Sequence, residues 1–222
     1  APPQVRAFTT YRHTGASHGP FSSLNVADHV GDDESLVGTN RQALQTALQL
    51  PSSPRWLAQV HGDRVVDLDS VSSVCSIEAD ASLTRQAGVV CAVLTADCLP
   101  VVLCDDQGEV VAAVLAGWRG LAQGIVASSI RAMGVPAAKT LVWLGPAIGP
   151  QAFEVGAEVR TAFLAISQDY APCFTPSGTR YLADIYAIAR VQLQQLGHCG
   201  ARRVGLHPPA ERERGRRRQR VR

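Results

Sequence analysis

Residues 88–120 read GVVCAVLTADCLPVVLCDDQGEVVAAVLAGWRG, and this stretch decides the fold class. It contains three short runs rich in β-branched residues, at 89–94, 101–104 and 110–115. Short apolar runs bounded by turn residues are typical of buried strands. The polar turn at 105–108 joins the second run to the third and predicts a β-hairpin.

A thiol and a carboxylate lie side by side between the first two runs, at Cys98 and Asp97, with Pro100 following closely. Proline disfavours the helical conformation of the residue before it, so we expect Leu99 to be extended and Cys98 to lie at the end of a strand. Binding and catalytic residues are concentrated in the loops that follow strand ends. The same stretch therefore predicts a candidate site.

The rest of the chain mixes helical and extended patterns. Apolar residues recur at helical spacing in four segments, which we predict as helices at 35–50, 121–133, 156–166 and 181–196. Extended segments are predicted at 4–12, 56–60, 65–68 and 141–144. Because helices and strands do not alternate strictly, we predict an α+β fold in which mixed β-sheets are flanked by helices.

Length and composition favour a single domain. The chain has 222 residues, 46% of them hydrophobic, which is enough to bury one substantial core. No apolar run has the length of a membrane span, and the first residues lack the pattern of a signal peptide. The six cysteines are scattered without the spacing of a disulfide framework. We expect a cytoplasmic protein that does not enter a membrane.

The charge is unevenly distributed. From residue 201 on the chain holds nine arginines and two glutamates, whereas the preceding 200 residues hold 12 basic and 17 acidic groups. A basic segment can contact nucleic acid, but this one has no aromatic residue on which a base would stack. We therefore predict a solvated tail and no nucleic-acid partner.

His61 and Cys98 are the residues best suited to chemistry. A thiolate with a histidine base is a nucleophile, and the same two side chains are also zinc ligands. Their separation of 37 residues favours neither chemistry, and either side chain alone is also common in a purely structural role. Asp97 could orient His61 or cap a turn, while Arg41 and Arg119 could bind an anion or pair with surface carboxylates.

Five motifs, in this order along the chain, carry a family resemblance. They are Gln-Val-His-Gly at 59–62, Ala-Asp-Ala at 79–81, Thr-Ala-Asp-Cys-Leu-Pro-Val at 95–101, Ala-Gly-Trp-Arg-Gly at 116–120 and Leu-Gly-Pro-Ala-Ile-Gly-Pro at 144–150. Together they resemble the YfiH family, also called the laccase-domain or multicopper polyphenol oxidoreductase family. The resemblance extends from about residue 6 to about residue 200.

The resemblance implies a zinc-dependent enzyme. It implies phosphorolysis of purine nucleosides (adenosine, inosine, guanosine and methylthioadenosine), with adenosine deamination as a second activity and phosphate as the other substrate. It also implies a zinc ion held by one cysteine and two histidines, of which Cys98 and His61 match two. Within the matched motifs, Asn25, Arg41, Asp97 and Arg119 are expected to bind substrate or to position the loops around it.

The chain departs from the family at the third zinc ligand, because Leu115 stands where the family has its second histidine. Leucine cannot bind a metal, so the site is impaired unless another histidine replaces it; the candidates are His13, His18, His29, His198 and His207. A Cys98–His61 thiol hydrolase and a non-catalytic binding protein are the alternatives. Laccase-type chemistry with copper is favoured least, since six histidines are too few for several copper centres.

The end of the chain departs as well. The family closes with an apolar strand, whereas residues 205–222 contain none. We therefore predict a YfiH-like catalytic domain over 1–204 and a basic tail over 205–222 that is disordered or foreign to the family. The sequence sets no oligomeric state.

Overall fold

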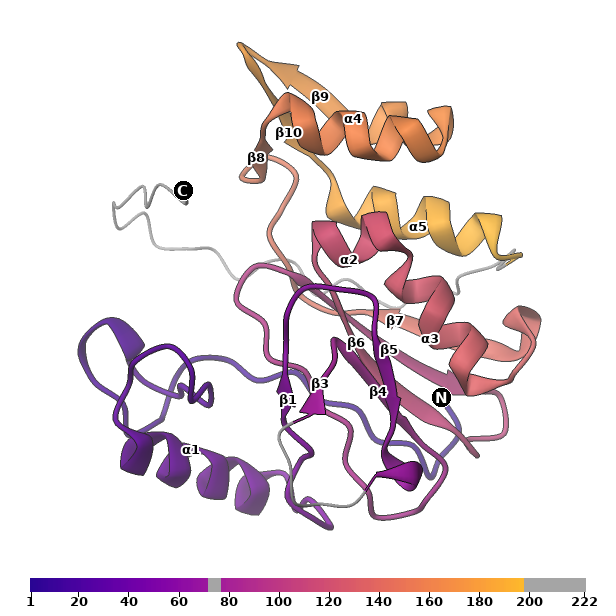
Figure 1. Ribbon diagram of the computed structural model, residues 1–222. Coiled ribbons are helices and arrows are strands. Elements are labelled where there is room, and N and C mark those ends of the chain that lie inside the picture. Colours follow the sequence, from indigo (N-terminus) through magenta and orange to yellow (C-terminus); the bar gives the residue numbers. More distant parts are fainter. Residues whose placement is uncertain (72–76, 198–222) are drawn as a thin grey trace.

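The computed structural model describes residues 1–71 and 77–197, and its centre is a five-stranded mixed sheet (Figure 1). The strands are arranged in the order β2-β4-β6-β5-β7. Their bounds are Val65–Asp67 for β2, Ala81–Thr84 for β4, Leu99–Asp105 for β5, Val111–Ala116 for β6 and Thr140–Leu144 for β7. β2 and β4 are parallel, and the other neighbours are antiparallel. The predicted α+β class with mixed sheets is confirmed.

The β5–β6 hairpin gives the sheet two different faces. Side chains of paired strands alternate between the faces. The pairs Leu99↔Ala116, Val101↔Val114 and Leu103↔Ala112 all belong to the main apolar core. The intervening pair Pro100↔Leu115 therefore points to the opposite face. This second face carries the candidate site.

Four helices lie on the side of the first face, with α2 and α3 nearest to the sheet and α4 farthest from it (Figure 1). They are α2 (Trp118–Gln123), α3 (Ile125–Met133), α4 (Ala157–Ile166) and α5 (Ile185–Gln195). Their apolar sides form one core with the sheet. Beside α4, a small antiparallel sheet combines β8 (Glu154–Val155), β10 (Arg180–Ala183) and β9 (Phe174–Ser177).

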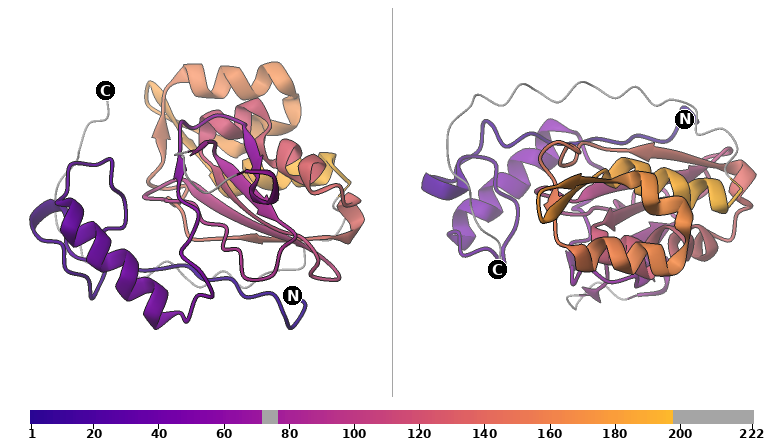
Figure 2. Two further views of the ribbon diagram at one scale, coloured as in Figure 1. Left: turned by 60° about the horizontal axis from the view of Figure 1, so that its bottom comes forward. Right: turned by 90° about the horizontal axis from the view of Figure 1, so that it is seen from above.

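The N-terminal part of the chain lies apart from those helices, as Figures 1 and 2 both show. Its helix α1 (Glu34–Ala47) begins at Asp33, whose carboxylate accepts a hydrogen bond from the backbone N–H of Ser35. A two-stranded parallel sheet, β1 (Leu57–Ala58) with β3 (Ile77–Glu78), connects this part to the central sheet. The 3-10 helices are η1 (Gly19–Phe21), η2 (Leu68–Ser70), η3 (Ala137–Lys139) and η4 (Gln168–Cys173).

Two of the predicted strands are wrong. Residues 4–12 form neither helix nor strand, and most are exposed, because they find no strand to pair with. The apolar run at 89–94 is half-buried and makes only one bridge, between Arg55 and Cys91. A side chain replaces the missing ladder there, since the Gln59 amide donates to the Leu94 carbonyl oxygen and accepts from the Leu94 N–H.

Two predicted helices need corrected bounds. The segment predicted at 121–133 begins earlier, at Trp118, and is broken into α2 and α3 by Gly124, which has a left-handed φ of 90°. The helix predicted from residue 181 begins at Ile185, because residues 180–183 pair in β10 and the Asp184 carboxylate caps the helix by accepting from the Ala187 N–H. The helices predicted at 35–50 and 156–166 are confirmed as α1 and α4 with small shifts.

Phe163 lies in the core between α4 and the 3-10 helix η4, and its substitution tests how much this part of the core contributes to stability. Its ring is fully buried, and its centre lies 5.3 Å from that of Tyr170 and 5.9 Å from that of Phe174. Phe163→Ala is expected to lower the free energy of unfolding by about 3–5 kcal/mol, because it removes buried surface and leaves a cavity. Urea unfolding measures this, with the exposed Phe8→Ala as the control that should cost far less.

Candidate functional site

His61 is presented by a tight loop that follows β1. Its backbone has a positive φ of 63°, which is uncommon for a residue with a side chain. The loop is held by the buried carboxylate of Asp80, which accepts hydrogen bonds from the N–H groups of Val60, His61 and Gly62 at 3.1, 2.7 and 2.8 Å. The His61 ring is thereby held at the surface of the sheet, with its side chain exposed.

Cys98 lies immediately before β5, at a strand end as predicted, and is half-buried. The hairpin register places it opposite Gly117, one position beyond the last pair of strand residues. A Cβ atom built on Gly117 would lie 3.0 Å from the Cys98 Sγ atom and 3.2 Å from the His61 Cδ2 atom. The two candidate residues therefore converge on one point, and the missing side chain of Gly117 leaves the space between them open.

Gly120, the second glycine of the Ala-Gly-Trp-Arg-Gly motif, allows α2 to pack closely against the His61 loop. A Cβ on Gly120 would lie 2.8 Å from the Gly62 carbonyl oxygen, which is too close for any side chain. Both glycines of the Ala-Gly-Trp-Arg-Gly motif are thus required by the geometry of the site. Helix α2 and the loop at 60–62 form one packed unit beside Cys98.

The surroundings of Cys98 keep its thiol protonated. Burial raises the pKa of Cys98, and the nearby Asp97 and Asp80 carboxylates raise it further. A reactive thiolate is instead stabilised by neighbouring positive charge. A thiolate that acts without an added cation is therefore disfavoured here.

Position 115 points at the same opening. Gly117 is in an extended conformation that continues β6, so residues 115 and 117 project to the same face. Leu115 is fully buried, yet it belongs to neither apolar cluster formed by the described residues. The strand alternation thus puts Leu115 on the same side of the sheet as Cys98 and the opening beside Gly117.

The residues present do not complete a zinc site. Catalytic zinc takes three protein ligands. Cys98 and His61 offer two donors at the opening, and position 115, on the same side of the sheet, holds a leucine. Within residues 1–71 and 77–197, no three His, Cys, Asp or Glu side chains are placed to hold a metal ion. The predicted substitutes His198 and His207 lie outside the described residues.

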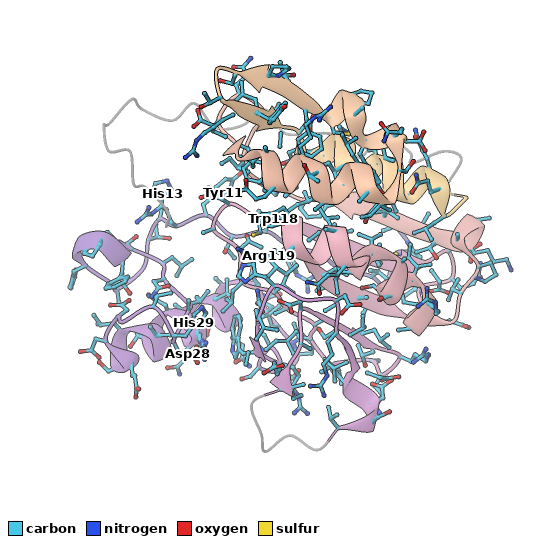
Figure 3. The ribbon with its side chains drawn as sticks, turned by 45° about the horizontal axis from the view of Figure 1, so that its top comes forward. Tyr11, His13, Asp28, His29, Trp118 and Arg119 are labelled. Atoms are coloured by element: carbon cyan, nitrogen blue, oxygen red, sulfur yellow. The ribbon has the colours of Figure 1, made fainter. Side chains whose placement is uncertain are left out.

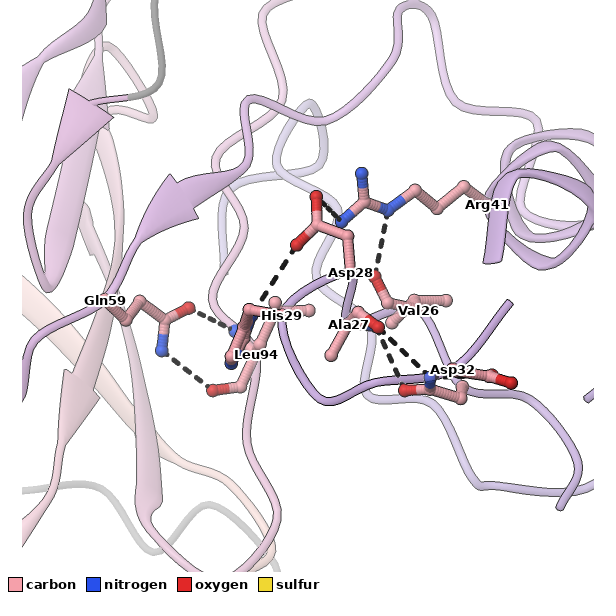
Figure 4. A network of polar contacts seen from close by, with 9 residues as sticks. Val26, Ala27, Asp28, His29, Asp32, Arg41, Gln59 and Leu94 are labelled. Carbon is pink, nitrogen blue, oxygen red and sulfur yellow. Dashed lines mark hydrogen bonds and ion pairs between the residues drawn. The ribbon is translucent and has the colours of Figure 1, made fainter. Parts of the chain in front are cut away.

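Asn25 and Arg41 both contact the backbone of the turn at 25–32, and Figure 4 shows the contacts of Arg41. The Asn25 amide donates to the Ala27 carbonyl oxygen and to Asp32, and accepts from the Ala27 N–H. The Arg41 Nε atom donates to the Val26 carbonyl oxygen at 2.9 Å. Both residues therefore hold the turn at 25–32 in place.

Asp28 and Trp56 complete the surroundings of Arg41. The Arg41 guanidinium pairs with the Asp28 carboxylate at 3.1 Å and stacks over the Trp56 ring at 4.5 Å. Burial opposes ionisation of Asp28, but Arg41 lowers its pKa overall. The guanidinium thus contacts the Asp28 carboxylate on one side and the Trp56 ring on another.

Arg119 is differently placed. It lies in the first turn of α2, is exposed, and stacks over the ring of Trp118 at 4.6 Å. Figure 3 shows its side chain on the side of α2 that faces the N-terminal segment carrying His13 and Asp28. Among the described residues it makes no hydrogen bond or ion pair, so its guanidinium is free to bind an anion. Asp97 is exposed beside Cys98, and its carbonyl oxygen accepts from the Ile148 N–H.

Sequence reasoning missed the roles of Asp80 and Gly117. Both occur in motifs that the sequence displays, Ala-Asp-Ala at 79–81 and Ala-Gly-Trp-Arg-Gly at 116–120. The available signal for Asp80 was a carboxylate placed between two small apolar residues, Ala79 and Ala81. Its partners are backbone N–H groups, which no residue type reveals.

A family model described as multi-copper polyphenol oxidoreductase laccase matches residues 6–203. The chain belongs to this family. The resemblance predicted from the five motifs is thereby confirmed. The matched range includes His61, Cys98, Asn25, Arg41, Asp97 and Arg119.

Relatives in this family carry the name purine nucleoside phosphorylase. The one from Pseudomonas aeruginosa is 50% identical over 195 residues, which are 87% of this chain and 78% of that protein. The purine nucleoside phosphorylase YfiH of Escherichia coli K12 is 46% identical over 196 residues, 88% of this chain and 80% of its own length. Enzymes are thus found among close members of the family.

A solved structure confirms the fold. A Neisseria meningitidis protein superposes with a TM-score of 0.78 at 42% identity, covering 84% of this chain and 76% of that one. Among the described residues, no helix is long and apolar enough to cross a membrane. The predicted cytoplasmic location and the domain bounds 1–204 and 205–222 stay predictions, and residues 198–222 lie outside those described.

Proposed function

We propose that this chain binds purine nucleosides and phosphate and catalyses phosphorolysis at the opening beside Gly117. The observation that carries the proposal is the convergence of Cys98 and His61 on that opening, in a chain whose relatives are named purine nucleoside phosphorylases. Adenosine, inosine, guanosine and methylthioadenosine are the proposed substrates. Adenosine deamination is proposed as a second reaction at the same site.

The reaction makes clear demands on the site. In phosphorolysis, a phosphate oxygen forms a bond to C1′ of the ribose while the bond from C1′ to the purine nitrogen breaks. The purine leaves with that electron pair and takes up a proton. The site must therefore hold a phosphate anion at C1′ and supply a hydrogen-bond donor to the leaving base.

The residues around the opening meet these demands in part. Arg119 offers a free, planar guanidinium, which binds phosphate oxygens in pairs. The exposed His61 ring offers two nitrogen atoms that can donate or accept a hydrogen bond. We assign phosphate binding to Arg119 and contact with the nucleoside to His61.

Zinc was expected as the cofactor. Zinc would supply a positive charge that polarises an oxygen or activates water. Since the described residues, with a leucine at 115, provide two donors at the opening, we derive no step through zinc. The zinc-dependent form of the proposal requires a third ligand.

The proposal is tested by incubating the purified chain with inosine and phosphate and following hypoxanthine by liquid chromatography. Phosphate-dependent release of hypoxanthine that disappears in His61→Ala supports it. Inosine binding without turnover, measured by calorimetry, would favour the alternative of a non-catalytic binding protein. Turnover that is abolished by alkylation of Cys98 and needs no phosphate would favour the thiol hydrolase.

Arg119→Ala is expected to raise the KM for phosphate about 10- to 100-fold and to change the KM for the nucleoside little. Loss of a charge-assisted pair of hydrogen bonds to an anion costs about 1.5–3 kcal/mol, which corresponds to that range. Arg131→Ala on α3 is the matched control, because Arg131 is also an exposed helical arginine. An unchanged phosphate KM in Arg119→Ala would exclude Arg119 as the phosphate ligand.

A further inference from the structure

Asp80 is a buried carboxylate that accepts hydrogen bonds from backbone N–H groups alone among residues 1–71 and 77–197. Its side chain has no exposed surface, and it lies between β3 and β4. One of its oxygens accepts from the N–H groups of Val60 and His61, and the other accepts from that of Gly62. Burying a carboxylate is costly unless its oxygens accept hydrogen bonds. The three converging N–H groups offset this cost for Asp80.

The unusual backbone of His61 makes this convergence possible. Successive N–H groups in a turn that combines right-handed and left-handed conformations converge and form an anion-binding concavity. The φ of +63° at His61 provides the left-handed step. A strained conformation of this kind costs about 1–3 kcal/mol and persists when the surroundings hold it in place. The Asp80 carboxylate is what holds it.

Asp80 also connects the His61 loop to the strand beside Cys98. Its carbonyl oxygen accepts from the Leu115 N–H at 2.7 Å, and its own N–H donates to the Arg64 carbonyl oxygen at 3.0 Å. Leu115 lies two residues before Gly117, where the Cys98 and His61 side chains converge. Asp80 is thus hydrogen-bonded both to the loop of His61 and to strand β6, and it fixes the position of one relative to the other.

We propose that Asp80 is the positioning residue of this site, setting the His61 ring against Cys98 by binding the left-handed loop at 60–62. It touches the backbone of His61 and acts only through that residue. This proposal deepens the proposed function, and its activity test rests on that function.

Asp80→Asn is the test variant, because an amide has the size of the carboxylate but only one accepting oxygen. Its NH2 group cannot accept a hydrogen bond from a loop N–H group, so at least one of the three bonds is lost. Asp105→Asn is the matched control. Asp105 is also buried and accepts from three backbone N–H groups, those of Gln107, Glu109 and Val110. It lies at the far end of β5 from Cys98.

The first readout is independent of activity. In the unaltered chain, we expect a nuclear Overhauser effect between the His61 Hδ2 proton and the Gly117 Hα protons, because a Cβ on Gly117 would lie 3.2 Å from His61 Cδ2. The signal should be lost in Asp80→Asn and kept in Asp105→Asn. Retention in Asp80→Asn, or loss in both variants, would overturn the proposal.

A measurement on the unaltered chain covers the case in which Asp80→Asn fails to fold. The His61 and Gly62 amides lie in an exposed or half-exposed loop, yet both donate to Asp80. Their hydrogen exchange should be slower than that of the Asp63 amide in the same loop, by about tenfold or more. Equal exchange rates would show that Asp80 does not hold the loop.

The second readout is phosphorolysis. Asp80→Asn is expected to lower kcat/KM about 100-fold, the effect of a small misplacement of a reacting group, while Asp105→Asn lowers it little. In a His61→Ala background, Asp80→Asn should cause no further loss, since it acts through His61. If Asp80→Asn lowers kcat/KM by the same factor in the His61→Ala background as in the unaltered chain, the positioning role is contradicted. If the unaltered chain shows no phosphorolysis, the proposed function fails and the Overhauser and exchange measurements still decide the role of Asp80.

Discussion

Leu115→His is expected to raise the zinc content from a small fraction to about one ion per chain. The substitution places an imidazole at a fully buried position of β6 whose side chain points to the space between Cys98 and His61. It supplies the third donor that the described residues lack. Elemental mass spectrometry of protein purified with zinc and then freed of excess metal measures the effect.

The size of this effect follows from the energy of zinc binding. Structural sites bind zinc with about 10–16 kcal/mol at neutral pH, shared among their ligands, so one added ligand contributes several kcal/mol. A change of 1.4 kcal/mol alters a dissociation constant tenfold, and the affinity should therefore rise by several orders of magnitude. Without zinc, the buried imidazole has no such partner, and the variant should unfold at a lower temperature than the original chain.

Two further variants show whether the gain has this cause. Leu115→Gln introduces a polar side chain that is a poor zinc ligand, and it should leave the zinc content low. Leu115→His combined with Cys98→Ala should lose the zinc again, because Cys98 is one of the three donors. One zinc ion per chain in the original protein would contradict the prediction, since a different donor would then complete the site.

Local sequence patterns predicted the centre of the fold because the β5–β6 hairpin is a local structure. Its turn and both strands lie within 20 residues, and its register follows from the turn. The run at 89–94 has the same composition but is not a strand of this sheet, since β4 and β7 already occupy the positions beside the hairpin. Strand pairing is decided by such competition across the chain, which no single run reveals.

The two candidate ligands were predicted, but their geometry was not. His61 and Cys98 are 37 residues apart, and nothing in that spacing requires them to meet. They meet because Gly117 lies between them without a side chain, directly after a strand whose register places it opposite Cys98. A glycine contributes by the space it leaves, so its role becomes visible only in the folded structure.

Gly117→Ala is expected to lower kcat/KM by at least about 100-fold, while the fold is kept. The new methyl group would lie 3.0 Å from the Cys98 Sγ atom and 3.2 Å from the His61 Cδ2 atom, so both side chains must move apart. Gly117 has a φ of −67° and a ψ of 163°, which alanine adopts freely. The effect is therefore one of space, with a stability cost of about 1–3 kcal/mol for overpacking.

Gly62→Ala is the matched control for this prediction. Gly62 lies in the loop beside His61, but a Cβ there would meet no atom closer than 3.5 Å, which is an ordinary contact. Its activity and thermal stability should stay near those of the original chain. If Gly117→Ala keeps full activity, the space between Cys98 and His61 is not where the substrate reacts, and the reacting centre must be sought nearer to Arg119. If both variants lose activity equally, the loop at 60–62 tolerates no added atom and the loss cannot be assigned to the space between the two side chains.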